Sequence, residues 1–160
     1  MTEKQFVLPY VVYDSVDEME PADANLLREA RLAARNAYSP YSHFSVGAAL
    51  LLDNGVVVHG SNIENAAYPS GLCAERVAFF SAQSNYPDNA PVALALTAFS
   101  PASAVTEPVS PCGACRQVMV EAEQRYGRRI RIMTQGQTGK IMLFDGVGVI
   151  LPFVFTNLYE

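Results

Sequence analysis

The placement of the three cysteines constrains this chain more than any other feature of its sequence. Cys73 opens the segment Cys73-Ala-Glu-Arg76, and the other two cysteines lie in Pro111-Cys112-Gly-Ala-Cys115. Three thiolates leave one corner of a tetrahedral zinc site open for a water, which is how catalytic zinc sites are built. A single metal site therefore requires these two segments to meet in the folded protein.

Both cysteine segments are predicted to open helices, over residues 73–82 and 112–126. The free N–H groups and the dipole at a helix N-terminus favour the thiolate form of a cysteine. Cys115 follows Cys112 by one helical turn, so both sulfurs can face the same metal. Glu75, two residues after the first cysteine, is placed to handle the proton of a water in the open corner. A third thiolate makes a Zn²⁺ centre negative, and Arg76 is the candidate to compensate that charge.

The cysteines also allow interpretations other than a catalytic zinc site. The spacing of Cys112 and Cys115 alone also fits a thioredoxin-like redox pair, but a third cysteine followed by Ala-Glu leaves that hypothesis little room. A structural zinc site needs a fourth ligand, and His43 and His59 are the two histidines of the chain. Such histidines are more often plain hydrogen-bonding residues than ligands.

The pattern of apolar residues predicts an α/β fold with three layers, α/β/α, in which helices flank a mixed five-stranded sheet. Residues 1–21 are predicted to be an N-terminal extension, and residues 22–160 a single domain. The apolar part of the extension is expected either as an edge strand or packed against a neighbouring subunit, and the sequence does not decide between them. Asp53-Asn-Gly55 is a strong hairpin signal between the first two strands. The helices are expected at 22–38, 73–82 and 112–126, and the strands at 46–52, 56–61, 92–99, 129–134 and 141–144.

Composition excludes several classes of protein. The chain has 160 residues, half of them hydrophobic, which suits one domain with its own core. Its apolar runs are far shorter than a membrane span. The net charge is −5, whereas affinity for nucleic acid comes mostly from Lys and Arg, so no nucleic-acid partner is expected. An odd and sparse set of cysteines fits a reducing compartment, and we expect a cytoplasmic protein.

These motifs resemble the cytidine deaminases, in the three-cysteine branch of small homotetrameric enzymes. Besides the Cys-Ala-Glu and Pro-Cys-Gly-Ala-Cys segments, the similarity includes Tyr38-Ser-Pro-Tyr-Ser-His-Phe44 and Asn62-Ile-Glu-Asn-Ala-Ala-Tyr68. It implies a cytidine-deaminase-like fold and a zinc-activated water that deaminates cytidine and deoxycytidine hydrolytically, releasing ammonia. It also implies a role in pyrimidine salvage, and a homotetramer with active sites near the subunit interfaces.

The resemblance implies a role for each matched residue. One Zn²⁺ per chain is ligated by Cys73, Cys112 and Cys115, and Glu75 is the catalytic proton carrier. Arg76 matches an arginine that hydrogen-bonds the ligand thiolates. The nucleoside is contacted by Phe44 on the pyrimidine, Asn62 and Glu64 on the ribose hydroxyls, the backbone of Ala74 on the base, and Tyr68 and Phe155, some of these across subunit contacts.

Two departures from the family bear on these expectations. The N-terminal twenty residues have no counterpart in the family core. Leu151-Pro-Phe-Val-Phe155 carries bulky residues where the family usually has small ones between proline and phenylalanine.

The alternative substrate is a modified cytosine nucleoside such as blasticidin S, which related three-cysteine proteins accept.

Overall fold

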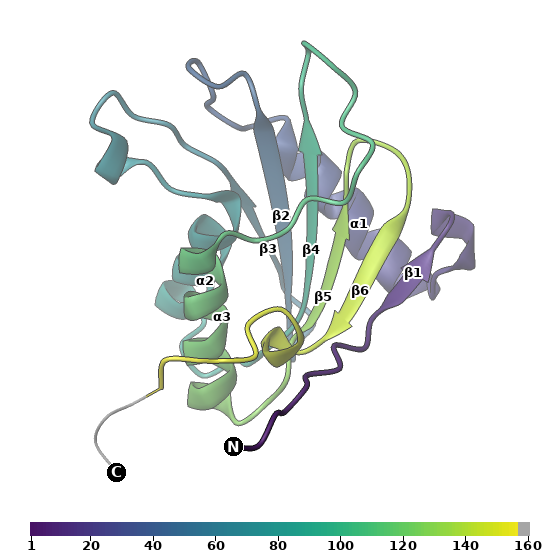
Figure 1. Ribbon diagram of the computed structural model, residues 1–160. Coiled ribbons are helices and arrows are strands. Elements are labelled where there is room, and N and C mark those ends of the chain that lie inside the picture. The colour runs from purple at the N-terminus through teal and green to yellow at the C-terminus, as the bar shows by residue number, and fades with distance from the viewer. Residues whose placement is uncertain (157–160) are drawn as a thin grey trace.

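A six-stranded mixed sheet carries helix α1 on one face and helices α2 and α3 on the other (Figure 1). The computed structural model describes residues 1–156. The strands lie in the order β1-β6-β5-β4-β2-β3. The elements are β1 Val11–Tyr13, α1 Pro21–Ala34, β2 Ser45–Leu52, β3 Val57–Ser61, α2 Ala74–Asn85, β4 Pro91–Phe99, α3 Gly113–Tyr126, β5 Arg131–Gln135 and β6 Ile141–Asp145.

The predicted three-layer α/β/α architecture is confirmed, and the sheet has one strand more than the five expected. β2 and β3 form an antiparallel hairpin around Asp53-Asn54-Gly55, where Gly55 takes a φ of 85°. β4 and β5 are parallel neighbours, and α3 makes the crossover between them, as parallel pairing requires. Figure 1 shows that α2 and α3 lie side by side on the same face of the sheet.

Alternation along the strands divides the core into two layers. Ala48 and Leu50 of β2 pack with the cluster under α2 and α3, whereas Ala49 packs with the cluster under α1. β4 is buried on both faces, as its continuous apolar run predicts. The cysteines therefore lie on one side of the sheet, and α1 lies on the other.

Close approach at Gly60 sets the start of α2 against the sheet. A Cβ added at Gly60 would lie 2.1 Å from the carbonyl oxygen of Ala74 and 2.6 Å from the amide nitrogen of Ala78. Both are backbone atoms, so a side chain at this position would displace the first turn of α2. That turn carries Glu75 and follows Cys73 directly.

We expect Gly60→Ala to destabilise the fold by about 1–3 kcal/mol, the usual cost of overpacking, and to weaken zinc binding because the first turn of α2 shifts. Gly148→Ala is the matched control, since a Cβ at Gly148 meets nothing within 4 Å. Chemical denaturation and zinc titration of both variants check this. Equal stability and equal zinc affinity in the two variants would contradict it.

Helix α1 ends four residues before the predicted boundary at Tyr38, so that boundary is wrong. The chain instead turns after Ala34, and the amide of Tyr38 donates to the carbonyl of Asn62 at 2.9 Å. The carbonyl of Tyr38 in turn accepts from the amide of Glu64 at 2.8 Å. This pairing brings the loop after α1 beside residues 62–64, and the local helical pattern contains no signal for it.

The N-terminal segment supplies the additional strand. β1 pairs antiparallel with β6, with Val11 opposite Leu143. Before it, Phe6 packs edge-on against Phe153, with ring centroids 4.8 Å apart. The division of the chain at residue 21 stays a prediction. Within residues 1–156, none of the helices is both long and apolar enough to cross a lipid bilayer.

Candidate active site

The three cysteines converge as the sequence predicts. Their sulfur atoms all lie within 4.8 Å of one another, with 3.8 Å between Cys73 and Cys112 and 3.4 Å between Cys112 and Cys115. All three are free thiols. Zinc–sulfur bonds of about 2.3 Å at tetrahedral angles place two sulfurs roughly 3.8 Å apart. The donor set therefore fits one Zn²⁺ held by three sulfurs.

Two helix N-termini hold the cluster. Cys73 and Cys112 are the N-cap residues of α2 and α3, so each helix begins one residue after its predicted start, and both cysteines have extended backbone angles. Neither side chain caps its helix, so both sulfurs point away from the backbone amides and toward each other. Cys115 is fully buried one turn into α3. The positive ends of both helix dipoles are directed at the cluster and favour thiolates there.

Proton sharing among the thiols favours one thiolate in the cluster and disfavours a second. A hydrogen bond from Cys115 lowers the pKa of Cys73 to about 5, and Arg76 also favours this thiolate. The same hydrogen bond raises the pKa of Cys115. A divalent cation would replace the shared protons, because metal binding by thiols releases them.

Arg76 lies beside the cluster, as the charge argument predicts. Its Nη2 is 4.0 Å from the Cys73 sulfur and 3.5 Å from the carbonyl oxygen of Gly71. Its Nε is buried and lacks a hydrogen-bond partner among the described residues. The guanidinium therefore lies at the limit of hydrogen-bonding distance from the Cys73 sulfur and places positive charge next to the thiolate.

Glu75 is buried in the same cavity as the cysteines. It is 5 % exposed, and burial followed by the charge of Cys73 raises the pKa of its carboxyl group. Cys73, Glu75 and Cys112 line a cavity of about 290 Å³. A carboxyl group with a raised pKa beside a metal-ligand cluster has the properties of a group that exchanges protons during catalysis.

Four residues expected to contact a nucleoside line this cavity as well: Phe44, Asn62, Glu64 and Ala74. The side chain of Asn62 bridges the loop and the sheet, accepting from the Val46 amide at 2.7 Å and donating to the Phe44 carbonyl at 2.9 Å. Asn62 therefore holds the backbone at Phe44, which is a positioning role that the sequence did not indicate.

Glu64 is held by the loop that precedes Phe44. Its carboxylate accepts from the amides of Tyr41 at 2.9 Å and Ser42 at 3.2 Å, and from the Ser42 hydroxyl. The Ser42 hydroxyl is the main reason that the pKa of Glu64 is lowered. Each carboxylate oxygen has two lone pairs, so acceptor capacity remains for a ligand hydroxyl.

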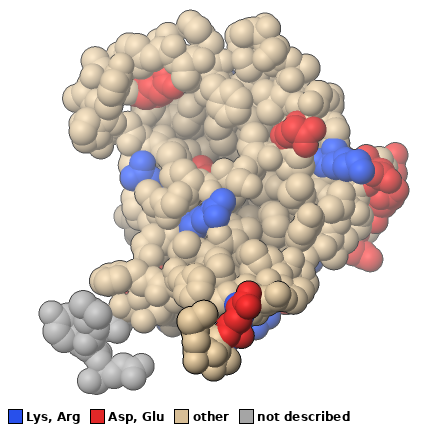
Figure 2. All heavy atoms as spheres, viewed as in Figure 1, with Lys and Arg blue, Asp and Glu red and all other residues tan. Residues whose placement is uncertain are grey.

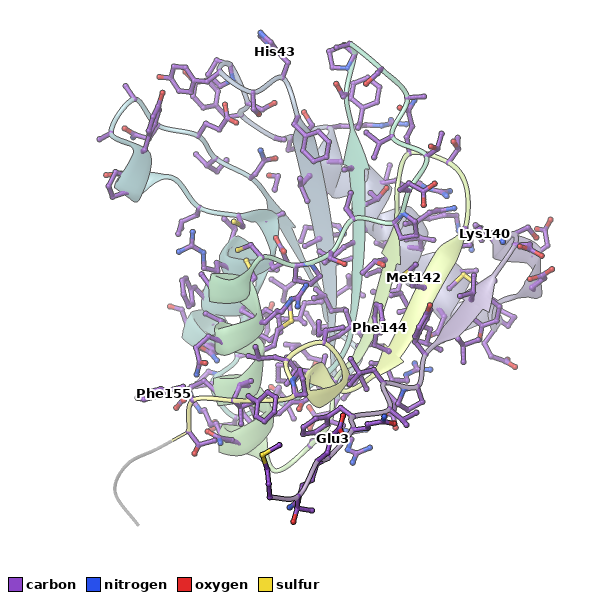
Figure 3. All side chains as sticks on the ribbon, in the orientation of Figure 1. Glu3, His43, Lys140, Met142, Phe144 and Phe155 are labelled. Carbon is purple, nitrogen blue, oxygen red and sulfur yellow. The ribbon has the colours of Figure 1, made fainter. Side chains whose placement is uncertain are left out.

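Tyr68 and Phe155 lie outside the cavity of their own chain. Tyr68 is 80 % exposed and lines an outer cavity of about 530 Å³, which shares Asn62, Glu64 and Cys73 with the inner one. Phe155 is 66 % exposed and points away from the sheet beyond α3 (Figure 3). Its backbone carbonyl accepts from Gln117 at 2.8 Å. A contact of Phe155 with substrate stays a prediction.

Neither histidine joins the metal cluster. Within residues 1–156, the group of side chains that could hold a metal consists of the three cysteines. His59 is hydrogen-bonded to Glu29 at 2.8 Å, and His43 is exposed and points away from the sheet (Figure 3). The alternative of a structural site with a histidine as fourth ligand finds no support in this geometry.

Arg116 is a supporting residue that the sequence reasoning missed. Its Nε donates to the carbonyl oxygen of Pro111 at 2.8 Å and its Nη1 donates to that of Ile150 at 2.5 Å. It thereby ties the residue before Cys112 to the C-terminal segment. Its place directly after Cys115 is the one available signal, and that position alone does not distinguish it from a solvated helix residue.

We expect Arg116→Ala to weaken zinc binding by about 10- to 100-fold, the usual effect of removing a group that orients a metal ligand. Arg125→Ala is the control, since Arg125 lies on the same helix and donates to Pro87, away from the cysteines. Competition with a chromophoric chelator measures the affinity of both variants. An Arg116 variant that binds zinc as tightly as the Arg125 variant would contradict the positioning role.

Comparison with known proteins agrees with this geometry. Residues 20–128 match the family described as cytidine and deoxycytidylate deaminase zinc-binding region. A cytidine deaminase from Sporosarcina psychrophila is 48 % identical over 99 residues, which are 60 % of this chain and 66 % of that protein. One from Halalkalibacterium halodurans is 51 % identical over 96 residues, which are 60 % of this chain and 68 % of that protein.

Solved structures give the same result. A cytidine deaminase from Burkholderia pseudomallei has a TM-score of 0.71 and 36 % identity, over 86 % of this chain and all (100 %) of that one. One from Mycobacterium tuberculosis has a TM-score of 0.64 and 36 % identity, over 84 % and 98 % of the two chains. The family match includes the segments that carry all three cysteines and Glu75. The chain therefore belongs to the cytidine and deoxycytidylate deaminase family.

Proposed function

We propose that this protein is a zinc-dependent hydrolase that deaminates cytidine and deoxycytidine to uridine and deoxyuridine, with release of ammonia. The observation that carries the proposal is one cavity of about 290 Å³ lined by Cys73, Glu75 and Cys112 together with Asn62 and Glu64. The cysteines supply a metal site and Glu75 a proton carrier. Asn62 and Glu64 offer hydrogen bonds to a sugar, and the curated relatives are named cytidine deaminases.

Different residues of this cavity contact different parts of the substrate. Phe44 packs against the pyrimidine ring, and the backbone of Ala74 contacts the polar edge of the base. Asn62 and Glu64 bind the ribose hydroxyls, and Glu64 is suited to accept from them because its lowered pKa keeps it ionised. Arg76 stabilises the thiolates through its contact with Cys73.

Proton transfer falls to Glu75. Zinc held by the three cysteines would lower the pKa of a water to about 7 and so make it available as a nucleophile. Glu75 accepts a proton from the attacking water and delivers it to N3 of the cytosine ring. It then carries the remaining proton of that water to the amino group on C4, which leaves as ammonia. The oxygen stays on C4, so the product is the uracil nucleoside.

An assay of ammonia release from cytidine, with and without a zinc chelator, tests the proposal. We expect turnover of cytidine and deoxycytidine, loss of turnover on chelation and recovery when zinc is restored. Blasticidin S is assayed beside them. Consumption of blasticidin S alone would overturn the nucleoside assignment, and turnover that persists in the chelated protein would overturn the zinc dependence.

A nucleic-acid substrate does not fit the charge of the protein. The net charge is −5. On the face of the molecule that is viewed in Figures 1 and 2, the Lys and Arg side chains form small separate groups interspersed with Asp and Glu, without a continuous basic track (Figure 2). Arg131 is paired with Asp23 at 2.8 Å and Arg129 with Asp145 at 3.3 Å. We therefore assign a free nucleoside as the substrate, in a cytoplasmic pathway of pyrimidine salvage.

Assembly into a homotetramer completes the proposal. Tyr68 and Phe155 are 80 % and 66 % exposed, which suits residues that contribute to the active site of a neighbouring subunit. Analytical ultracentrifugation gives the mass of the assembly. Phe155→Ala is expected to raise the KM for cytidine several-fold, and a monomeric active enzyme with an unchanged KM in that variant would contradict a shared site.

A further inference from the structure

A separate cavity lies on the face of the sheet opposite the cysteines. It has a volume of about 510 Å³ and forms between the C-terminal end of α1, the ends of β2 and β4, and the turn after β5. Figure 1 shows the end of α1 behind β2 and β4. The residues that matter for its chemistry are Arg31, Arg35, Phe99 and Gln137, and none of its lining residues within the described chain is acidic.

Two arginines one helical turn apart give this cavity a concentrated positive charge. Neither Arg31 nor Arg35 forms an ion pair within residues 1–156. The nearest acid along the helix, Glu29, is engaged with His59. Like charges at this spacing repel each other, and the negative end of the α1 dipole offsets only part of that repulsion. The pair is therefore an uncompensated cationic site in an acidic protein.

Arg31 also has a hydrogen-bond donor without a partner among the described residues. Arg31 Nη2 donates to the side-chain oxygen of Gln135, which orients the guanidinium. Arg31 Nε is buried without a partner among the described residues. A buried donor without a partner is costly, so a ligand that accepts from it would recover that free energy. Guanidinium groups favour phosphate because their planar fork matches two of its oxygens.

The size and lining of the cavity indicate more than a bare anion. Its volume is in the range of small-molecule sites, whereas inorganic phosphate would fill only a small part of it. Phe99 is 45 % exposed at its wall, next to the apolar surfaces of Ala34 and Ala98. An aromatic side chain in such a position can stack on a flat ring. We infer that this cavity binds a small organic phosphate, with its phosphate on Arg31 and Arg35 and its ring against Phe99.

Calorimetric titration of uridine 5′-monophosphate into the zinc-loaded protein tests this inference. Saturating uridine is present throughout. It occupies the catalytic cavity, so binding of the nucleotide through its nucleoside part there gives no calorimetric signal. We expect binding that weakens as salt is raised and about tenfold or more in Arg35→Gln. Arg28→Gln, an exposed arginine of the same helix outside the cavity, is expected to bind as the unaltered protein does.

Two further titrations distinguish the contact with the phosphate from the contact with the ring. Inorganic phosphate is expected to bind at least about tenfold more weakly than the nucleotide, and Phe99→Ser is expected to reduce nucleotide affinity to a similar extent. Absence of nucleotide binding, or equal affinity in Arg35→Gln and Arg28→Gln, would overturn the site. Equal affinity for phosphate and nucleotide would overturn the ring contact. A failure of uridine to bind would count against the proposed function, and the Arg35 comparison would still test this cavity.

Discussion

Replacing Glu75 with glutamine is expected to reduce turnover of cytidine by more than about 10⁴-fold while zinc stays bound. General acid–base catalysis by one positioned group contributes about 10²- to 10⁴-fold, and in the proposed mechanism Glu75 acts as base and then as acid in the same turnover. Glutamine keeps the shape of the side chain but cannot accept or deliver the proton. Steady-state measurement of uridine formation, with zinc content from elemental mass spectrometry, checks both parts of the expectation.

The structure explains why this substitution tests chemistry instead of stability. Glu75 is 5 % exposed and burial raises its pKa, so a neutral amide suits its surroundings at least as well as a carboxylate. Glu121→Gln, an exposed acid on α3, is the matched control and should keep full activity. Turnover within tenfold of the unaltered protein would remove Glu75 from the mechanism. Loss of zinc together with turnover would make Glu75 a structural support of the site.

The metal cluster was predictable because its signals are local. Cys73 and Cys112 each precede a helix, and Cys115 follows by one turn, so the sequence contains the direction of all three sulfurs once the two helices pack together. The hairpin at Gly55 and the buried strand β4 were predictable for the same reason, since turn chemistry and continuous apolar runs need no knowledge of distant partners.

The features that escaped prediction depend on partners far along the chain. Arg116 contacts Ile150, and its role exists only after the C-terminal segment has folded beside α3. Strand β1 is the edge-strand alternative for the N-terminal apolar segment, and only its pairing with β6 decides between the two alternatives. From the sequence alone, Arg31 cannot be distinguished from a solvated helix residue. Its surroundings are defined by Gln135, which it contacts, and by Phe99, which lines the same cavity. Periodicity reports which face of an element is buried, not which element covers it.

The short distances among the sulfurs also constrain what the apoprotein can be. Three ionised thiols within 4.8 Å would repel each other strongly, and the shared protons on Cys73 and Cys115 relieve that repulsion. Zinc binding displaces those protons, so apparent zinc affinity should fall as the pH is lowered. Arg76 and the two helix dipoles reduce this competition with protons, which explains why the cluster lies at the N-terminal ends of two helices.

Removal of Cys115 is expected to empty the site and to abolish activity. If three sulfurs share the about 10–16 kcal/mol typical of structural zinc binding, loss of one costs about 3–5 kcal/mol, or roughly 10²- to 10⁴-fold in affinity. We therefore expect Cys115→Ala to retain less than about a tenth of the zinc of the unaltered protein, measured by elemental mass spectrometry after dialysis, and to lose detectable deamination.

The thermal response of the same variant separates loss of metal from loss of packing. Bound zinc stabilises the folded state by mass action, so a chelator should lower the Tm of the unaltered protein and leave that of Cys115→Ala unchanged. Val120→Ala is the control, because Val120 is a buried residue of the same helix, 3 % exposed and outside the cluster. It should lower the Tm through its cavity yet keep the zinc and the response to chelator. A Cys115 variant that keeps one zinc per chain would show that the other two cysteines suffice, and the three-thiolate site would be wrong.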